Sequence, residues 1–183
     1  MKQGLIIFVL FVAMLGGVYW YAESPKKLAP ENTVYYTNPT YGISFSYPDT
    51  YELVEQDIGS GERRRYVIAL ADKEALSRAP QNGEGPPSIT FDIFQNNIDN
   101  TSIENWIRGT NFSNFKLNLD GELSPTSVGR ARALSYTWDG LYRSQSIVFE
   151  HNENIVMSTV GYLSAQDEIV RDFTYILSTV ELF

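Results

Sequence analysis

An α+β domain with a central antiparallel β-sheet flanked by helices, preceded by one N-terminal transmembrane helix, is predicted from three observations. An apolar block without a charged side chain occupies residues 4–22. From residue 43 onward, short segments follow one another in which apolar and polar residues alternate. An amphipathic helical pattern closes the chain. Strands in succession with helices at intervals are typical of an antiparallel sheet with helices packed on it.

Residues 4–22 are long enough to cross a bilayer as a helix. At about 1.5 Å per residue they extend about 28 Å, close to the thickness of the hydrocarbon core. Aromatic residues with a polar group are favoured at the membrane interface, so we expect Tyr19, Trp20 and Tyr21 to mark the outer boundary. Positive charge favours the cytoplasmic side, so residues 1–3, which include Lys2, form a short cytoplasmic segment.

Three alternatives for the apolar block stay open. In the first, the block is a cleaved signal peptide and the protein is secreted. Cleavage needs small residues at the first and third positions before the cut, but a cut after Ala22 would place the large Trp20 at the third position. It is the helix of a pilin-like subunit in the second, but no acidic residue precedes Glu23. It is a buried core helix in the third.

The outer domain begins after a proline-containing linker. Residues 23–33 are polar and carry Pro25 and Pro30, which predicts an extended tether of about 30 Å ahead of a domain at 34–183. Period-two alternation in the first half of this domain predicts strands at 43–47, 51–57, 66–71 and 89–93. Three prolines and two glycines predict a surface loop at 77–88.

Two helices and a meander of three strands are expected in the second half. The first helix begins near Ile103, with Asn100 or Thr101 as its N-cap. The last helix has Ser164 as N-cap, acidic residues in its first turn and apolar residues at helical spacing as far as Val180. The three strands are expected at 132–138, 142–150 and 155–162.

Two segments resemble the PsbP-like family. Residues 36–48, YTNPTYGISFSYP, are similar to its opening hairpin, in which an aromatic-and-Asn strand leads through a glycine turn into a G-[FI]-S-[FI]-x-[YF]-P strand. Residues 173–180, FTYILSTV, are similar to its closing helix with the pattern F-x-x-I-L-x-T. Tyr51 stands where the family commonly has Trp. The resemblance implies an α/β/α sandwich with a central antiparallel sheet.

The resemblance transfers no catalytic residue, because both matched segments are structural. Photosystem extrinsic subunits, a nuclear-import factor and bacterial surface proteins share the implied fold, and fold does not determine function. The sequence itself has no cysteine, no G-x-S-x-G motif, no P-loop and no G-x-G-x-x-G. Its single histidine, His151, is expected at a solvated hairpin tip. We therefore predict no catalytic, metal-binding or cofactor-binding residue and no enzyme activity.

Charge constrains the partners of the outer domain. Residues 28–183 hold 11 of the 14 basic and 21 of the 22 acidic residues, a net charge of about −10. This balance disfavours binding to nucleic acid or to an anionic lipid surface. In the one basic cluster, Arg63 and Arg65 would share a face of a strand, so they are candidate ligand-binding residues for a carboxylate or an anionic glycan.

These observations favour a membrane-anchored, extracytoplasmic binding or accessory module of the cell envelope. Its expected partners are the membrane, through the N-terminal helix, and an envelope protein or cell-wall polymer within reach of the tether. The alternative from another class is an envelope hydrolase that uses carboxylates assembled from the sheet.

Overall fold

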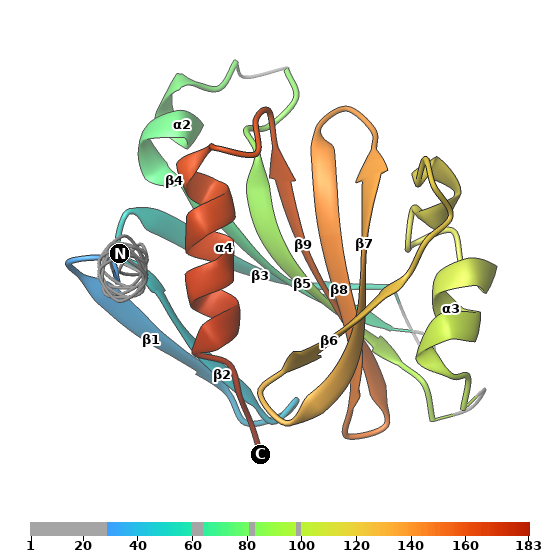
Figure 1. Ribbon diagram of the computed structural model, residues 1–183. Helices are drawn as coiled ribbons and strands as arrows, with labels where there is room; N and C mark the ends of the chain where they lie inside the picture. Colours follow the sequence, from blue (N-terminus) through green and yellow to red (C-terminus); the bar gives the residue numbers. More distant parts are fainter. Residues whose placement is uncertain (1–28, 60–63, 81–82, 98–99) are drawn as a thin grey trace, which may run out of the picture.

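The computed structural model describes residues 29–59, 64–80, 83–97 and 100–183 (Figure 1). The strands are β1 (Thr33–Asn38), β2 (Ile43–Pro48), β3 (Tyr51–Ile58), β4 (Arg65–Asp72), β5 (Ser88–Gln95), β6 (Ser124–Val128), β7 (Ala131–Asp139), β8 (Arg143–His151), β9 (Asn154–Tyr162) and β10 (Glu181–Leu182). The helices are α2 (Lys73–Arg78), α3 (Ile103–Gly109) and α4 (Glu168–Ser178), with a 3₁₀ turn, η2, at Phe115–Leu117.

The expected transmembrane helix at 4–22, with Tyr19, Trp20 and Tyr21, lies outside the described residues. Within the part of the chain that the structure describes, no helix combines the length and the apolar character needed to cross a bilayer.

Antiparallel pairing dominates the domain. Among the described residues, seven strands form a sheet in the order β3-β4-β5-β9-β8-β7-β6, and three more form a small sheet in the order β1-β2-β10. All neighbouring strands are antiparallel, which confirms the predicted antiparallel sheet. The pairing of β5 with β9, with Ile89 opposite Val160, joins the two halves of the chain.

The large sheet has a hydrophobic core on each face. Neighbouring residues of β8 show this, because Ile147 and Phe149 belong to one core and Val148 belongs to the other. The first core also contains Phe173 from α4 and residues from β2. The second contains Ile107 from α3. The two helices therefore cover opposite faces of the sheet.

Helix α2 and strand β6 were not expected from the sequence, and neither were the short elements η2 and β10. Helix α2 begins before the expected loop at 77–88 and includes its first two residues, and the Asp72 carboxylate caps it by accepting a hydrogen bond from Ala75 N at 2.8 Å. It was missed because it is a short helix without a buried residue, so it shows no apolar stripe. Strand β6, with the sequence SPTSV, was missed because it is an exposed edge strand and lacks alternation.

The helix ends differ from their predicted positions. The N-cap of α3 is Ser102, whose hydroxyl accepts from Asn105 N at 3.3 Å, and neither Asn100 nor Thr101 takes this place. The N-cap position of α4 is Asp167 instead of Ser164, because the Asp167 carboxylate accepts from the backbone N–H of Ser164 at 2.8 Å and folds the preceding loop back.

The chain also leaves α4 earlier than predicted, at Ser178, so Val180 is not helical. The side-chain oxygen of Thr179, just beyond the helix, accepts a hydrogen bond from Ser46 N at 2.9 Å. This contact ties the chain to β2, with which β10 then pairs.

Candidate ligand-binding site

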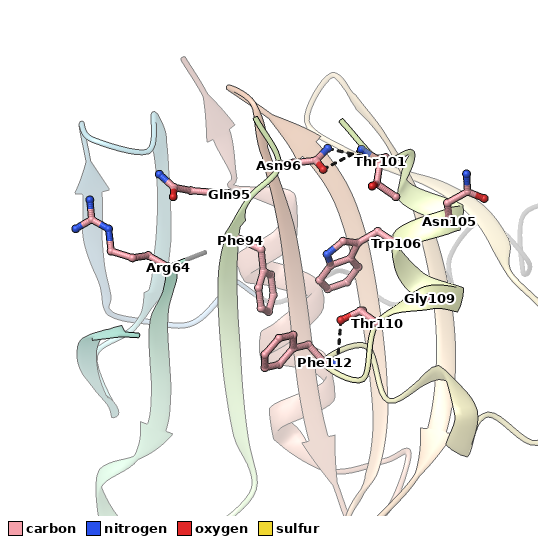
Figure 2. Close-up of a pocket in the computed structure, with 10 residues that line it drawn as sticks. All are labelled: Arg64, Phe94, Gln95, Asn96, Thr101, Asn105, Trp106, Gly109, Thr110 and Phe112. Atoms are coloured by element: carbon pink, nitrogen blue, oxygen red, sulfur yellow. Dashed lines mark hydrogen bonds between the residues drawn. The ribbon is translucent and has the colours of Figure 1, made fainter. Parts of the chain in front are cut away.

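A pocket of about 360 Å³ opens between the end of β5 and α3 (Figure 2). We call it the α3 pocket. Its lining comes from the residue before β4, from the end of β5, from α3 and from the segment that follows α3. Volumes of a few hundred cubic ångströms are typical of small-molecule sites.

Three aromatic side chains form the wall of the α3 pocket. The Phe94 ring packs against both of the others, with its centroid 4.9 Å from that of Trp106 and 5.2 Å from that of Phe112. Phe94 comes from β5 and Trp106 from α3, whereas Phe112 follows α3. Phe94 is buried, but Phe112 is 55% exposed. Phe112, together with the half-buried Trp106, therefore gives a ligand access to ring faces.

Polar groups flank this aromatic wall. Figure 2 shows Arg64 and Gln95 on one side of the rings and Asn105 on the other. The Asn96 amide is engaged, because it donates to Thr101 O and accepts from Thr101 N, both at 3.0 Å. By contrast, the side-chain amides of Gln95 and Asn105 make no hydrogen bond within the described residues.

Arg65, one of the two predicted ligand residues, supports the aromatic wall. Its Nε and Nη2 atoms donate to Asp92 Oδ1 at 2.8 and 2.5 Å. Asp92 is only 3% exposed and also accepts from the Thr90 hydroxyl at 3.0 Å. The Arg65 guanidinium carbon lies 5.7 Å from the ring centroids of both Phe94 and Phe112. The ion pair with the buried Asp92 of β5 thus holds Arg65 beside these two rings.

The other arginines of the basic cluster are placed differently. Arg63 lies outside the described residues. Arg64 lines the α3 pocket, but Figure 2 shows its guanidinium directed away from the three rings. There its Nη1 atom lies 3.5 Å from Asp57 Oδ2 in an exposed ion pair. A ligand-binding role of Arg63 and Arg65 stays a prediction.

Sequence reasoning missed the rings and amides of the α3 pocket. The helical spacing of Ile103, Trp106 and Ile107 predicts only that these three residues share one face of a short helix. It does not predict that the Trp106 ring also reaches a hollow. The signal that could have found the site is Phe112, a large apolar residue just beyond the end of the helix.

A second hollow, of about 400 Å³, lies beside the N-terminal half of α4 and bears on the hydrolase alternative. Its lining includes Asp49, Glu168 and Asp172. Burial raises the pKa of Asp172, while the Tyr51 hydroxyl, which donates to Asp172 Oδ2 at 2.9 Å, opposes this rise. Burial and the Asp172 charge also raise the pKa of Tyr51. Glu168 is exposed and pairs with Arg171.

His151 connects two turns instead of standing free at a hairpin tip. Its Nε2 atom lies 2.9 Å from Gly42 O, in the turn between β1 and β2. The neighbouring Asn152 amide donates to Phe183 O at 3.1 Å. In the part of the chain that the structure describes, no group of three or more histidine, aspartate or glutamate side chains is arranged to hold a metal ion.

Comparisons with known proteins concern the fold. No protein-family model and no curated protein matches the sequence. The solution structure of cyanobacterial PsbP (CyanoP) from Synechocystis aligns with a TM-score of 0.57 at 10% identity, over 85% of this chain and 95% of that chain. A crystal structure from Bacteroides thetaiotaomicron aligns with a TM-score of 0.42 at 10% identity, over 81% of this chain and 48% of that chain. The similarity to CyanoP confirms the PsbP-like fold that the resemblance implied.

Proposed function

We propose that this chain, with its PsbP-like fold, is a non-catalytic binding module of the cell envelope, anchored by residues 4–22 and exposed outside the cytoplasm. The α3 pocket is the observation that carries the proposal. It combines accessible rings of Trp106 and Phe112 with the side-chain amides of Gln95 and Asn105, which make no hydrogen bond to any residue that the structure describes. Aromatic side chains with a few polar groups placed around them are a common form of a ligand site.

The position of the α3 pocket suits a domain that is tethered at its N-terminal end. Figure 1 places β1, which follows the linker, and α3 on opposite sides of the molecule. A domain tethered through β1 would therefore present the pocket away from its anchor. With a tether of about 30 Å, the pocket reaches material beyond the membrane surface.

A site-specific crosslinker in intact cells tests whether the α3 pocket binds an envelope component. We expect the full chain to form an adduct with an envelope component when the photoreactive residue replaces Asn105. The control position is Tyr35, which is exposed on β1, away from the pocket. Equal adducts from both positions, or adducts with cytoplasmic components from Asn105, would contradict the proposal.

Protease access tests the topology separately. If residues 34–183 lie outside, protease digests them in cells whose cytoplasmic membrane is intact. Digestion only after lysis would show the opposite orientation.

A hydrolase is the second candidate, and the hollow beside α4 is the observation that favours it. It holds Asp172, buried and with a raised pKa, and Glu168, exposed and ion-paired, so the two carboxyl groups have different environments. Turnover of a chromogenic glycoside or ester by the purified chain, lost in both Asp172→Asn and Glu168→Gln, would replace the binding-module proposal. The pilin-like alternative rests on the N-terminal apolar block alone.

A further inference from the structure

We infer that the ligand of the α3 pocket is a neutral oligosaccharide, which packs its sugar rings on Trp106 and Phe112 and hydrogen-bonds its hydroxyls to Gln95 and Asn105. This inference rests on the proposed binding function and names the ligand class of the same pocket.

The accessible rings suit a sugar. A pyranose ring presents a face of C–H groups, and such a face packs favourably on the electron-rich face of an aromatic ring. Phe112 is 55% exposed, although large apolar side chains are normally buried, and it contacts the buried Phe94 ring from the outside. Trp106 contacts the same Phe94 ring. The two outer rings thus form a platform for more than one sugar unit.

The platform is held in place before any ligand binds. The Thr110 side-chain oxygen accepts from Phe112 N at 3.2 Å. The Ser113 hydroxyl donates to Ile107 O at 2.6 Å, and the Tyr136 hydroxyl donates to Ser113 O at 2.6 Å. These bonds fix the segment after α3 against the sheet. Binding to a fixed platform avoids part of the entropy loss of ordering it.

The polar groups distinguish a sugar from a peptide. The Gln95 and Asn105 amides each offer donors and an acceptor, and the Thr110 hydroxyl keeps its own O–H as a donor. Sugar hydroxyls donate and accept in the same way, so they satisfy both kinds of group. A proline-rich peptide, the other common ligand of aromatic grooves, presents chiefly carbonyl acceptors, because proline has no N–H.

Charge distinguishes a neutral glycan from an acidic one. Among the described residues that line the α3 pocket, Arg64 is the single charged one, and its guanidinium is turned from the rings toward Asp57. The Arg65 charge is compensated by Asp92. The rings and amides therefore form an uncharged surface within a domain of net charge about −10. Among the described residues, an anionic polymer finds no free cation beside the rings, and the domain as a whole repels it.

The test is calorimetric titration of the full-length chain in neutral detergent with two neutral oligosaccharides, a cello- and a chito-oligosaccharide of four units. We expect at least one to bind. Phe112→Ala should weaken binding on the order of 10-fold and Asn105→Leu about 5-fold, as the loss of one contact residue commonly does. Leu141→Ala, a control at another exposed apolar side chain in the β7–β8 turn, should leave the affinity unchanged. Unfolding midpoints equal to that of the parent chain establish that each variant is folded.

The outcomes separate the ligand class from the binding function. Binding of a polyuronate in place of the neutral probes overturns the neutral class. Binding of a proline-rich peptide in place of both glycans overturns the glycan class. The glycan class is also overturned if no probe binds while the Asn105 crosslink still forms in cells. Failure of that crosslink instead removes the binding function on which the inference rests.

Discussion

Arg65 and Asp92 form the buried ion pair that positions the aromatic wall. A buried carboxylate is tolerated when it is paired and hydrogen-bonded, as Asp92 is by Arg65 and Thr90. The basic cluster is visible in the sequence, but nothing local shows that Arg65 has its partner on the neighbouring strand. That partner follows from the β4–β5 register, which sets Arg65 opposite Phe94 and Val67 opposite Asp92.

Removing Arg65 should destabilise the protein because it leaves Asp92 charged and unpaired. For Arg65→Met we expect a loss of about 3 kcal/mol in the free energy of unfolding, at the lower end of the range for buried pairs because the Arg65 side chain is 32% exposed. Denaturant unfolding measures this loss. Arg64→Met, which removes an exposed pair, should lose less than about 1 kcal/mol. Adding Asp92→Asn to Arg65→Met should recover most of the lost stability. Equal losses for Arg65→Met and Arg64→Met would contradict the assignment of Arg65 to a buried ion pair.

Asp172 should make stability depend on pH. Burial raises the pKa of Asp172 in the folded state, so the folded protein holds the proton more tightly than the unfolded chain does. Its contribution to stability is therefore full below the ordinary aspartate pKa of about 3.9 and is lost as pH rises through the raised pKa. Asp172→Asn stays neutral and can still accept the Tyr51 hydrogen bond.

Unfolding midpoints measured in urea from about pH 4 to 8 test this effect. The stability of Asp172→Asn relative to the parent chain should increase with pH and then level off. Asp139→Asn, at an exposed position, is the matched control for the loss of one carboxylate. A difference between Asp172→Asn and the parent chain that does not change with pH would show that Asp172 has an ordinary pKa in the folded protein.

The tight turn between β8 and β9 illustrates what local patterns predict about elements. The strands and their polar tip follow from alternation, and the structure confirms them within one or two residues at each end. The backbone of the tip does not follow, because Asn152 and Glu153 both have positive φ, 48° and 59°, and glutamate rarely adopts this conformation. Helix α2 and strand β6 were missed for the related reason that exposed elements carry no apolar period.

Glu153→Gly should stabilise the β8–β9 turn. Asn-Gly is a preferred pair where both central residues have positive φ, and glycine removes the steric cost of the left-handed conformation. After allowing for the greater entropy of glycine in the unfolded chain, we expect a gain of about 0.5–1 kcal/mol, seen as a higher thermal midpoint. The matched control Glu150→Gly, within strand β8, should lower the midpoint. If Glu153→Gly lowers the thermal midpoint as much as Glu150→Gly does, the backbone of Glu153 is not strained in the parent chain.

The whole domain depends on one sheet that is covered on both faces. Strands β5, β8 and β9 contribute residues to both cores, so unfolding of these strands disrupts both cores at once. With no cysteine in the chain, packing and hydrogen bonds carry the stability of this arrangement without a disulfide. We therefore expect the domain to unfold as one cooperative unit.

Ile176→Ala tests this cooperativity. Ile176, on α4, is completely buried in the larger core, and its truncation should remove about 2–5 kcal/mol of stability. Trp106 and Trp138 report on the opposite face, where they pack against the smaller core. In a Trp20→Phe background, their fluorescence transition should move by the same amount as the far-ultraviolet circular dichroism transition. A fluorescence midpoint that stays in place would show that the two cores unfold independently.

Local patterning was sufficient for the class of fold. Period-two alternation located most of the strands, helical spacing located α3 and α4, and the segments at 36–48 and 173–180 indicated the PsbP-like fold, because each of these signals is carried by consecutive residues. The α3 pocket could not be predicted in this way. Its rings come from Phe94, Trp106 and Phe112, and the β4–β5 pairing and the packing of α3 on the sheet bring them together with Arg65. Such contacts depend on strand register and packing between separate elements, which no local period encodes.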